Sequence, residues 1–201
     1  MDAGEFQAAT GASDAAVAEL ERYRRMLEAG NAVMNLVGPA TLPDFWSRHA
    51  LDSAQLLDHA PGARTWADLG AGAGLPGVVL AILLKGVDGA KVWLIDSQAK
   101  RCRFLQQVVE ALALPAEVIN ARAETLKIKA EVVTARACAP LDRLLDFAEP
   151  YLRRGAGGLF LKGEQAEAEL AEARRRRSRL DAQVLPSLSD PRGRILRIRS
   201  L

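Results

Sequence analysis

The order of apolar and polar positions divides the chain into a helical beginning and a longer part in which strands and helices alternate. Residues 1–12 are small and polar, and we expect them to be frayed. Ser13 is the expected N-cap of a first helix, whose apolar side chains recur at helical spacing until Gly30 ends it. A second helix is predicted over residues 41–57. Residues 1–60 therefore predict a helical appendage.

The second part, residues 61–201, alternates between short apolar runs and amphipathic stretches. Strands are predicted at residues 65–69, 91–95, 117–120, 131–135 and 158–161, and helices at residues 78–85, 97–112 (capped by Ser97), 141–152 and 164–180. Strands joined through helices form parallel crossovers. Residues 182–185 and 194–199 are separated by only a short loop, which predicts an antiparallel hairpin at one edge. We expect an α/β fold in one structural domain, a Rossmann-like, mostly parallel, seven-stranded sheet with an antiparallel terminal hairpin.

Composition narrows the class of protein without naming a function. With 201 residues, 49% of them apolar, the chain is long enough for one well-buried core. The net charge of +2 does not by itself indicate a nucleic-acid partner, so the local distribution of charge must do so. Two cysteines, Cys102 and Cys138, predict a reducing compartment, and we assign them no chemistry. The first ten residues do not resemble a signal peptide, and the longest apolar run, residues 78–84, is too short to cross a bilayer. We expect a soluble, cytoplasmic protein with no membrane contact.

The most informative segment is the turn of residues 68–77, which reads Asp-Leu-Gly-Ala-Gly-Ala-Gly-Leu-Pro-Gly. It follows a predicted strand and precedes a predicted helix. Glycines permit the sharp turn and let a ligand approach the backbone at the helix N-terminus. The G-x-G-x-x-G spacing of residues 72–77 occurs in nicotinamide, flavin and S-adenosylmethionine (SAM) proteins alike. The alternative is a glycine turn that only directs the path of the chain and binds no ligand.

Three features favour SAM over a dinucleotide. The turn begins early, at Asp68, and is richer in glycine than a dinucleotide turn requires. Asp96 ends the second strand, where a carboxylate can accept hydrogen bonds from the ribose hydroxyls. The seven strands with a terminal hairpin match the methyltransferase variant of the fold, and no Tyr-x-x-x-Lys pair for hydride transfer is present. After the third strand, the backbone near Ala123 and the carboxylate of Glu124 are placed to contact adenine, although Glu124 is equally well explained as a solvated cap.

Cations at the same sheet edge are candidates for contacts to the cofactor or the substrate. Arg136 ends the fourth strand, where an unpaired guanidinium is costly to bury, so it is expected to bind the cofactor carboxylate or the target base. Lys162 follows the fifth strand and can meet a phosphate. Lys100 and Arg101 begin the helix after Asp96 and are either a solvated face or a phosphate contact.

Two further groups of charges leave alternatives open. Arg48 and Asp52 are spaced to pair on a helix surface. His49 is interpreted first as a satisfied histidine where helix meets sheet and second as an RNA contact, and we expect no metal site, since the chain has only two histidines. The arginine cluster of residues 174–179 is either an RNA contact or paired with glutamates of its own helix.

Five segments of the chain carry a resemblance to a known family. They are Arg-His-Ala-Leu-Asp-Ser at residues 48–53, the glycine turn at 68–77, Leu-Ile-Asp-Ser-Gln-Ala-Lys-Arg-Cys-Arg-Phe-Leu at 94–105, Thr-Ala-Arg-Ala at 134–137, and Leu-Lys-Gly at 161–163. In this order they resemble the bacterial 16S rRNA guanine-N7 methyltransferases, the glucose-inhibited division protein B or ribosomal RNA small subunit methyltransferase G family.

The resemblance implies a SAM-dependent enzyme that acts on one guanine of 16S rRNA. The expected cofactor contacts are Gly70, Gly72, Leu75, Asp96, Ala123, Glu124 and Arg136, and the expected RNA contacts are Arg48, His49, Lys100, Arg101 and Lys162. Guanine N7 has a free lone pair, so methylation needs alignment and no general base. The chain has no Asn-Pro-Pro-Tyr segment and no Pro-Cys pair, in agreement with this chemistry, and Arg136 has at most a positioning role. The substrate is 16S rRNA or the small ribosomal subunit, and we expect a monomer. Alternatives are another RNA, a small molecule, or a SAM- or nucleotide-binding module without catalysis.

Overall fold

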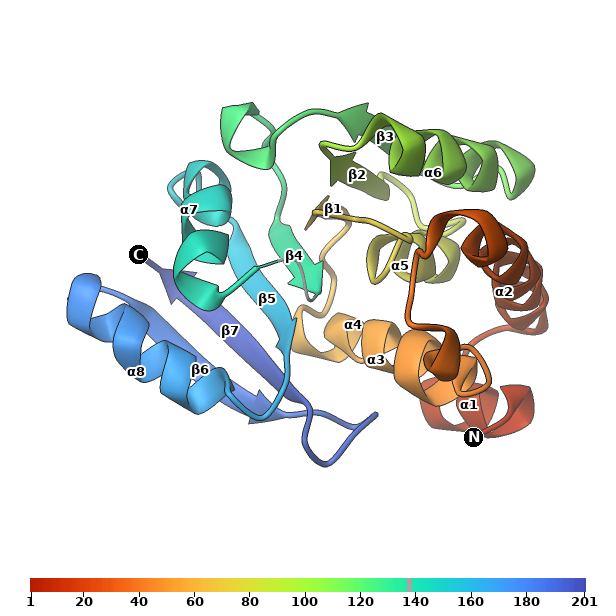
Figure 1. Ribbon diagram of the computed structural model, residues 1–201, viewed down its shortest axis with the longest axis horizontal. Helices are drawn as coiled ribbons and strands as arrows, with labels where there is room; N and C mark the ends of the chain where they lie inside the picture. The colour runs from red at the N-terminus through yellow and green to blue at the C-terminus, as the bar shows by residue number, and fades with distance from the viewer. Residues whose placement is uncertain (137–138) are drawn as a thin grey trace.

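The described residues form one twisted sheet of seven strands in the order β3-β2-β1-β4-β5-β7-β6 (Figure 1). The computed structural model describes residues 1–136 and 139–201, so Ala137 and Cys138 lie outside the described residues. The strands are β1 (Thr65–Leu69), β2 (Lys91–Asp96), β3 (Ala116–Asn120), β4 (Val132–Arg136), β5 (Gly157–Lys162), β6 (Asp181–Pro186) and β7 (Arg194–Ser200). The first five are parallel, and β7 runs antiparallel to both β5 and β6. The α/β sheet with an antiparallel terminal hairpin is therefore confirmed.

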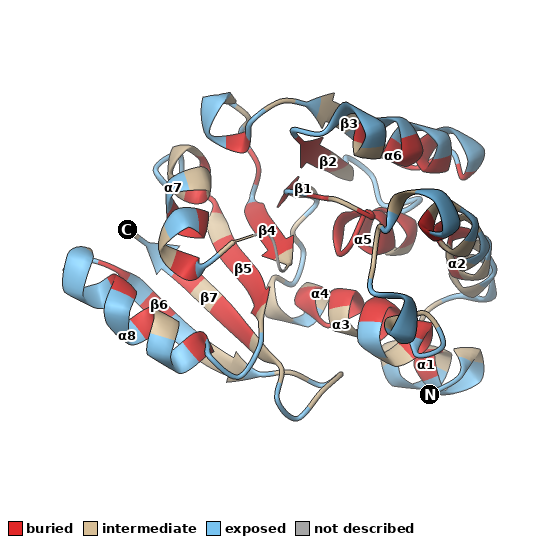
Figure 2. Ribbon diagram, viewed as in Figure 1, coloured by how far each residue is buried: buried red, intermediate tan, exposed pale blue. Residues whose placement is uncertain are grey.

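Helices cover both faces of this sheet and define two apolar cores. They are α1 (Ala3–Thr10), α2 (Asp14–Met34), α3 (Asp52–Ala54), α4 (Leu56–His59), α5 (Gly77–Leu83), α6 (Ala99–Ala111), α7 (Leu141–Leu152) and α8 (Ala166–Arg176). Alternate strand residues serve the two cores: Trp66 packs with α2, α5 and α6, whereas its neighbour Ala67 packs with α7 and α8. Buried residues accordingly line the sheet and the inner sides of the helices (Figure 2). No helix in the described residues has the length and hydropathy that a bilayer crossing needs.

The first residues are ordered, so the prediction of a frayed start is wrong. Asp2 accepts a hydrogen bond from the Glu5 amide at 2.9 Å, and the Glu5 carboxylate accepts one from the Asp2 amide at 2.8 Å. This capping box begins α1. The apolar Phe6 is fully buried against Trp46, with the ring centroids 5.4 Å apart. Reciprocal capping and one buried aromatic ring thus hold a segment whose other residues are small and polar.

The helix α2 begins as predicted but runs longer. The Ser13 hydroxyl accepts a hydrogen bond from the Ala16 amide at 3.2 Å, which confirms the predicted N-cap. Gly30 does not end the helix, which continues to Met34. A Cβ at Gly30 would come within 2.8 Å of the Phe104 ring of α6. The glycine therefore allows two helices to pack closely and does not act as a C-cap.

Residues 41–57 do not form the single α-helix that their spacing predicts. The chain forms a 3₁₀ turn (η1, Pro39–Thr41), a π-helix (η2, Phe45–Leu51) and then the short helices α3 and α4. A π-helix has a wider turn than an α-helix, is rare in proteins and is frequently found at functional sites. The Ser53 hydroxyl of α3 donates to the His49 carbonyl of η2 at 2.7 Å. Ser97 is also not a cap, because the Asp96 carboxylate accepts the hydrogen bond from the Gln98 amide that precedes α6.

Candidate functional site

A cavity of about 1140 Å³ opens at the carboxyl ends of the parallel strands. Its walls come from the segments that follow β1, β2, β3, β4 and β5, together with residues 36–52 and the loop between β6 and β7. Open α/β sheets bind ligands at this edge. The structure thus brings the glycine turn, Asp96, Glu124 and Arg136 to one place. Lys100, which was also expected there, is exposed and is not among the residues that line the cavity.

The glycine turn combines left-handed backbone with close packing. Gly70, Gly72 and Gly74 have φ values of 68°, 57° and 97°, a region that side chains with a Cβ disfavour. Gly77 starts α5, and a Cβ there would lie 2.3 Å from Leu94 Cδ2. Each glycine is therefore needed for the path of the turn. One carbonyl group of the turn is also held by another element, since the buried Tyr23 hydroxyl of α2 donates to the Ala73 carbonyl at 2.8 Å.

Asp68 lies beneath the turn and supports it from inside the protein. Its Oδ2 accepts a hydrogen bond from the Gly77 amide at 2.9 Å, and its Oδ1 has no partner among the described residues. Complete burial raises the pKa of Asp68 to about 7. The Gly77 amide and the positive charge of Arg136 act against this rise, and the negative charge of Asp96 adds to it. Asp68 is therefore a buried support of the turn rather than a residue of the cavity wall.

Asp96 lines the cavity and also holds the turn. Its Oδ2 accepts from the Gly72 amide at 2.9 Å, its Oδ1 accepts from the Gln98 amide at 2.8 Å, and the side chain is only 4% exposed. Arg101 lies 3.7 Å from Oδ2. Each carboxylate oxygen keeps a second lone pair, so Asp96 can still accept hydrogen bonds from two hydroxyl groups of a ligand.

The far wall of the cavity suits a flat base. Ala123 and Glu124 lie in a 3₁₀ turn (η3, Ala123–Thr125), which the Tyr151 hydroxyl ties to α7 by donating to the Ala123 carbonyl at 2.9 Å. The exposed Glu124 and the half-buried ring of Phe147 both line the cavity. An apolar ring and a carboxylate in one cavity wall match the needs of an adenine ring and its amino group.

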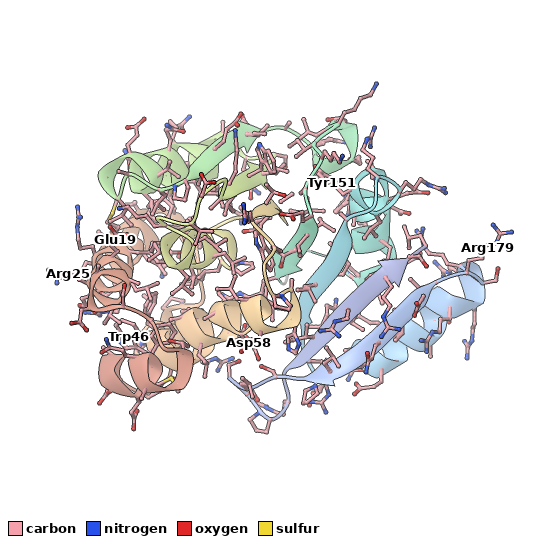
Figure 3. All side chains as sticks on the ribbon, turned by 180° about the vertical axis from the view of Figure 1, so that it is seen from behind. Glu19, Arg25, Trp46, Asp58, Tyr151 and Arg179 are labelled. Atoms are coloured by element: carbon pink, nitrogen blue, oxygen red, sulfur yellow. The ribbon has the colours of Figure 1, made fainter. Side chains whose placement is uncertain are left out.

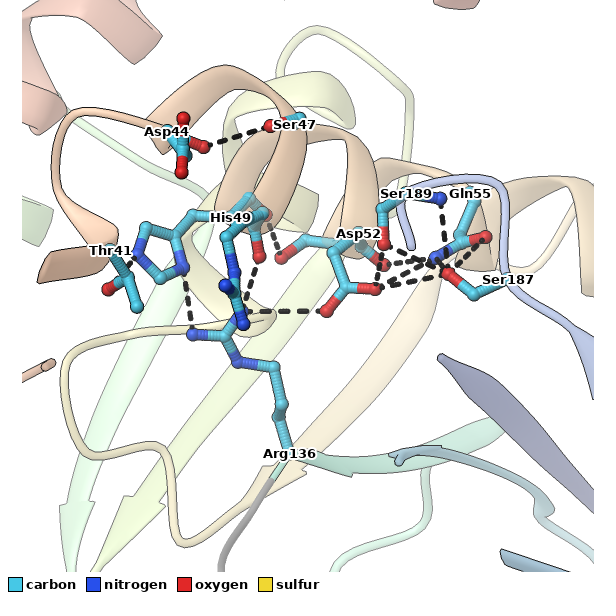
Figure 4. Close-up of polar contacts among 11 residues, drawn as sticks. Thr41, Asp44, Ser47, His49, Asp52, Gln55, Arg136, Ser187 and Ser189 are labelled. Atoms are coloured by element: carbon cyan, nitrogen blue, oxygen red, sulfur yellow. Dashed lines mark hydrogen bonds and ion pairs between the residues drawn. The ribbon is translucent and has the colours of Figure 1, made fainter. Parts of the chain in front are cut away.

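Arg136 occupies the centre of the site and is held by three acceptors (Figure 4). Its Nη1 donates to the Arg48 carbonyl at 2.9 Å and lies 3.5 Å from Asp52 Oδ2, and its Nη2 donates to His49 Nδ1 at 3.0 Å. All three acceptors come from η2 and the residue after it. The predicted surface pair of Arg48 with Asp52 is therefore wrong, because the Asp52 carboxylate faces Arg136.

His49 is a buried, neutral histidine beside this arginine. The residue is 3% exposed, and burial, followed by the charges of Arg136 and Arg48, lowers its pKa to about 3. Its Nε2 lies 3.0 Å from the Thr41 hydroxyl, which itself donates to the Gly38 carbonyl at 2.7 Å. The imidazole thus links the η1 turn to the guanidinium.

Asp52 connects Arg136 to a loop that the sequence did not suggest. Its Oδ1 accepts from the Ser189 hydroxyl at 2.6 Å and from Gln55 Nε2 at 3.0 Å. Gln55 Oε1 in turn accepts from the Leu188 amide at 2.7 Å. These bonds hold the β6–β7 loop at the cavity rim (Figure 4). The partners are more than 130 residues apart in sequence, and no local pattern marks them.

The basic residues near the cavity fall into paired and unpaired groups. The Lys162 ammonium lies 2.7 Å from the Glu169 carboxylate and donates to the Ala139 carbonyl, so its charge is neutralised within the protein. Arg48, Arg122 and Arg143 line the cavity, and none of them has a carboxylate within 4 Å in the described parts of the chain. They are exposed, which leaves three positive charges available at the rim.

The arginine cluster of residues 174–177 is bound to acidic residues and backbone. Arg176 and Arg177 pair with Asp142 of α7, and Arg175 pairs with Glu172 of its own helix. Arg179, beyond the end of α8, extends into solvent (Figure 3). Two of these arginines therefore join α8 to α7, while the Arg174 guanidinium donates to the Ala182 carbonyl of β6. Within residues 1–136 and 139–201, no group of three metal-ligating side chains is present.

Comparisons with known proteins agree with this geometry. The family model described as "rRNA small subunit methyltransferase G" matches residues 16–193. A "Ribosomal RNA small subunit methyltransferase G" of Caulobacter vibrioides (strain NA1000 / CB15N) is 59% identical over the whole chain and 93% of its own length. One of Methylobacterium sp. (strain 4-46) is 44% identical over 96% of this chain and 93% of its own length.

Solved structures show the same fold at low sequence identity. A SAM-dependent methyltransferase from Aquifex aeolicus has a TM-score of 0.62 and 16% identity, with coverage of 85% of this chain and 98% of its own. A magnesium protoporphyrin IX methyltransferase from Synechocystis with bound SAM has a TM-score of 0.59 and 17% identity, with coverage of 82% and 86%. At such identities the likeness concerns the architecture alone.

Proposed function

Because this chain belongs to the rRNA small subunit methyltransferase G family, we propose that it transfers a methyl group from SAM to N7 of a guanine in 16S rRNA. The observation that supports this most directly is the meeting of the glycine turn, Asp96 and the held guanidinium of Arg136 in one cavity. The cavity volume of about 1140 Å³ exceeds the range of an ordinary small-ligand site of roughly 300–1,000 Å³. It therefore has room for the cofactor and a target nucleotide together.

The residues present fit a SAM molecule. We propose that Asp96 accepts the ribose hydroxyls, that Ala123 and Glu124 contact the adenine, and that Leu75 packs against the nucleoside. The backbone of Gly70 and Gly72 faces the amino-acid part, with Arg136 as the partner of its carboxylate. When bound, SAM supplies a methyl group made electrophilic by a positively charged sulfur.

Methylation at N7 asks little of the protein beyond placement. Guanine N7 has an in-plane lone pair and no proton to remove, so the residues of the cavity need only align it with the methyl group. The neutral His49 already accepts a bond from Arg136 and carries its proton toward Thr41, which leaves it no free nitrogen for general-base work. The site thus matches a reaction driven by alignment, and we propose no catalytic base.

We further propose that the three rim arginines, which have no carboxylate partner among the described residues, contact RNA phosphates. Arg48, Arg122 and Arg143 stand at the rim, and the Arg143 guanidinium lies over the Phe147 ring at 5.3 Å to the centroid. Replacement of Arg122 or Arg143 by Gln is expected to weaken rRNA binding and to lower the salt slope by about one unit each. Arg175→Gln is the matched control, because Arg175 pairs with Glu172 on α8. We assign Lys162 and the cluster at residues 174–177 a structural role.

One experiment tests the activity itself. The protein is incubated with methyl-labelled SAM and either undermethylated 16S rRNA or small subunits, and the modified nucleoside is identified after digestion. We expect 7-methylguanosine, and the two substrate forms show whether the RNA must be assembled. Label on an exocyclic amine or on cytosine C5 would contradict the proposed chemistry. SAM binding without transfer would indicate a binding module, and binding of NAD in place of SAM would indicate an oxidoreductase.

Further proposals concern the oligomeric state, the cellular location and the domain organisation of the protein. We propose that the protein works as a monomer in the cytoplasm, where its rRNA substrate is made. We also propose that residues 1–60 are an appendage and residues 61–201 the methyltransferase core, within one structural domain. Sedimentation equilibrium tests the first statement, and a single cooperative unfolding transition of the full chain in urea tests the single domain.

A further inference from the structure

We propose that His49 is a positioning residue that acts through Arg136, holding its guanidinium in the orientation that methyl transfer requires. The proposal rests on the proposed function for its kinetic part only. Its structural part concerns the protonation of one ring nitrogen and is independent of any substrate. It starts from the direction of three hydrogen bonds that connect Arg136, His49 and Thr41 (Figure 4).

The identity of the donors fixes the tautomer of His49. An arginine side chain has five N–H donors and no acceptor, so Arg136 Nη2 must donate to His49 Nδ1 across the 3.0 Å contact. Nδ1 therefore carries no proton. The proton of the neutral ring is on Nε2, which donates to the Thr41 hydroxyl at 3.0 Å. The Thr41 hydroxyl is free to accept it because its own hydrogen points to the Gly38 carbonyl at 2.7 Å.

Burial and charge keep the ring in this single state. A protonated His49 would be a buried cation in contact with the charged Arg136 and next in sequence to the charged Arg48. Burial and both positive charges therefore disfavour the protonated ring. All polar atoms of the imidazole are satisfied, and the Phe45 ring packs edge-on with its centroid 6.2 Å away. The imidazole is thus a rigid acceptor that does not titrate in the range where the enzyme works.

This acceptor determines which donors of Arg136 remain for a ligand. The Arg48 carbonyl and the Asp52 carboxylate engage Nη1, and His49 engages one hydrogen of Nη2. The Nε hydrogen and the second Nη2 hydrogen have no partner among the described residues, and the side chain lines the cavity at 18% exposure. Without His49 the guanidinium keeps contacts through Nη1 alone and can turn about that end. The two free donors would then lose their fixed direction.

Two substitutions of similar size separate positioning from packing. In His49→Asn the new side chain carries an amide oxygen attached to Cγ, as Nδ1 is in histidine, so it can accept from Arg136. In His49→Leu the new side chain fills similar space without an acceptor. We expect His49→Leu to weaken S-adenosylhomocysteine binding about tenfold or more, and to lower kcat/KM to match, because a bond to a charged group is lost. His49→Asn should recover most of this loss. The KM for rRNA should change little in either variant.

The second histidine of the chain provides the matched control. His59 Nδ1 lies 3.2 Å from Arg197 Nη2, a similar contact that is not part of the cavity wall. We expect His59→Leu to leave cofactor affinity and turnover unchanged. In an Arg136→Ala background, His49→Leu should cause no additional loss of affinity, because a residue that acts only through Arg136 has nothing left to position.

Nitrogen NMR of the ligand-free protein tests the structural part directly. Because the chain has two histidines, His59→Leu assigns the spectrum of His49. We expect a proton on Nε2, an unprotonated Nδ1, and no titration between about pH 5 and pH 8. A proton on Nδ1, equal binding defects in the Asn and Leu variants, or wild-type affinity in His49→Leu with an unchanged fold would each overturn the proposal. If the wild-type protein fails to methylate rRNA, the NMR and binding results still decide it.

Discussion

Replacement of Asp68 by Asn should change how the stability of the protein depends on pH. In the folded protein the Asp68 pKa is about 7, against an ordinary value of 3.8, because the carboxyl group is fully buried. Asn has the same shape and never ionises. Its amide oxygen can still accept from the Gly77 amide, which Asp68 Oδ2 does now at 2.9 Å. The variant therefore removes the charge while it keeps the hydrogen bond that starts α5.

The direction and size of this change in stability follow from the pKa values of Asp68 in the folded and unfolded chain. Below 3.8 the Asp68 carboxyl group is protonated in both states, so it does not affect the free energy of unfolding. Between 3.8 and about 7 only the unfolded chain loses the proton, and the folded state becomes less stable by about 1.4 kcal/mol per pH unit. Above pH 7 both states are ionised and the cost is constant at about 4 kcal/mol. Asp68→Asn should thus gain that amount relative to wild type as the pH rises from acid to neutral.

Urea unfolding of both proteins at a series of pH values measures this difference. Other carboxylates titrate in both proteins and cancel when the two free energies are subtracted. We expect the difference to rise in favour of the variant across the acid range and to level off above neutrality. When the same comparison is made in two proteins that both carry Arg136→Met, the difference in free energy should level off at a higher pH. The reason is that the positive charge of Arg136 lowers the Asp68 pKa. A difference that stays flat with pH would refute the assignment of a buried, uncharged Asp68.

Three further variants probe the walls of the site. Asp96→Asn should weaken SAM binding about tenfold in calorimetry, because one carboxylate oxygen becomes a donor group; an unchanged affinity would count against the ribose contact. Tyr23→Phe should lower the free energy of unfolding by about 1 kcal/mol in urea titration, since the bond to the Ala73 carbonyl is lost, and no change would show that this bond does not support the turn. Gly77→Ala should destabilise the protein by about 1–3 kcal/mol, because the new Cβ meets Leu94 at 2.3 Å; a wild-type midpoint would mean that α5 can shift freely.

The strands of the sheet could be predicted because the apolar residues of each strand are close together in the sequence. Val92, Leu94 and Ile95 of β2 are apolar and buried, and the strand ends where Asp96 begins the next turn. The strand β1 and the helix α7 match their predicted ranges to the residue. A strand buried between two layers of helices carries short apolar runs, such as Val92–Ile95, and these runs can be recognised from the sequence alone.

The predictions that were wrong concern contacts between segments that are distant in the sequence. A glycine often ends a helix, but Gly30 lies inside α2, where the ring of Phe104 from α6 occupies the space that a Cβ would need. The periodicity of residues 41–57 is helical, yet it does not distinguish a π-turn from an α-turn. The partner of Asp52 was sought four residues away and is found on β4. Local spacing carries no information about which strand end will lie opposite a helix.

The same contacts explain why the N-terminal segment belongs to the site. The sheet alone supplies Arg136, but all three acceptors that hold it lie in residues 48–52. Tyr23 of α2 supports the glycine turn, and residues 36–41 form part of the cavity wall. A guanidinium at a strand end without these partners would be mobile and would have no fixed pair of donors to offer a ligand. The helical appendage therefore completes the site that the sheet begins, and the π-turn at Phe45–Leu51 brings the His49 ring and the Arg48 carbonyl to the same arginine.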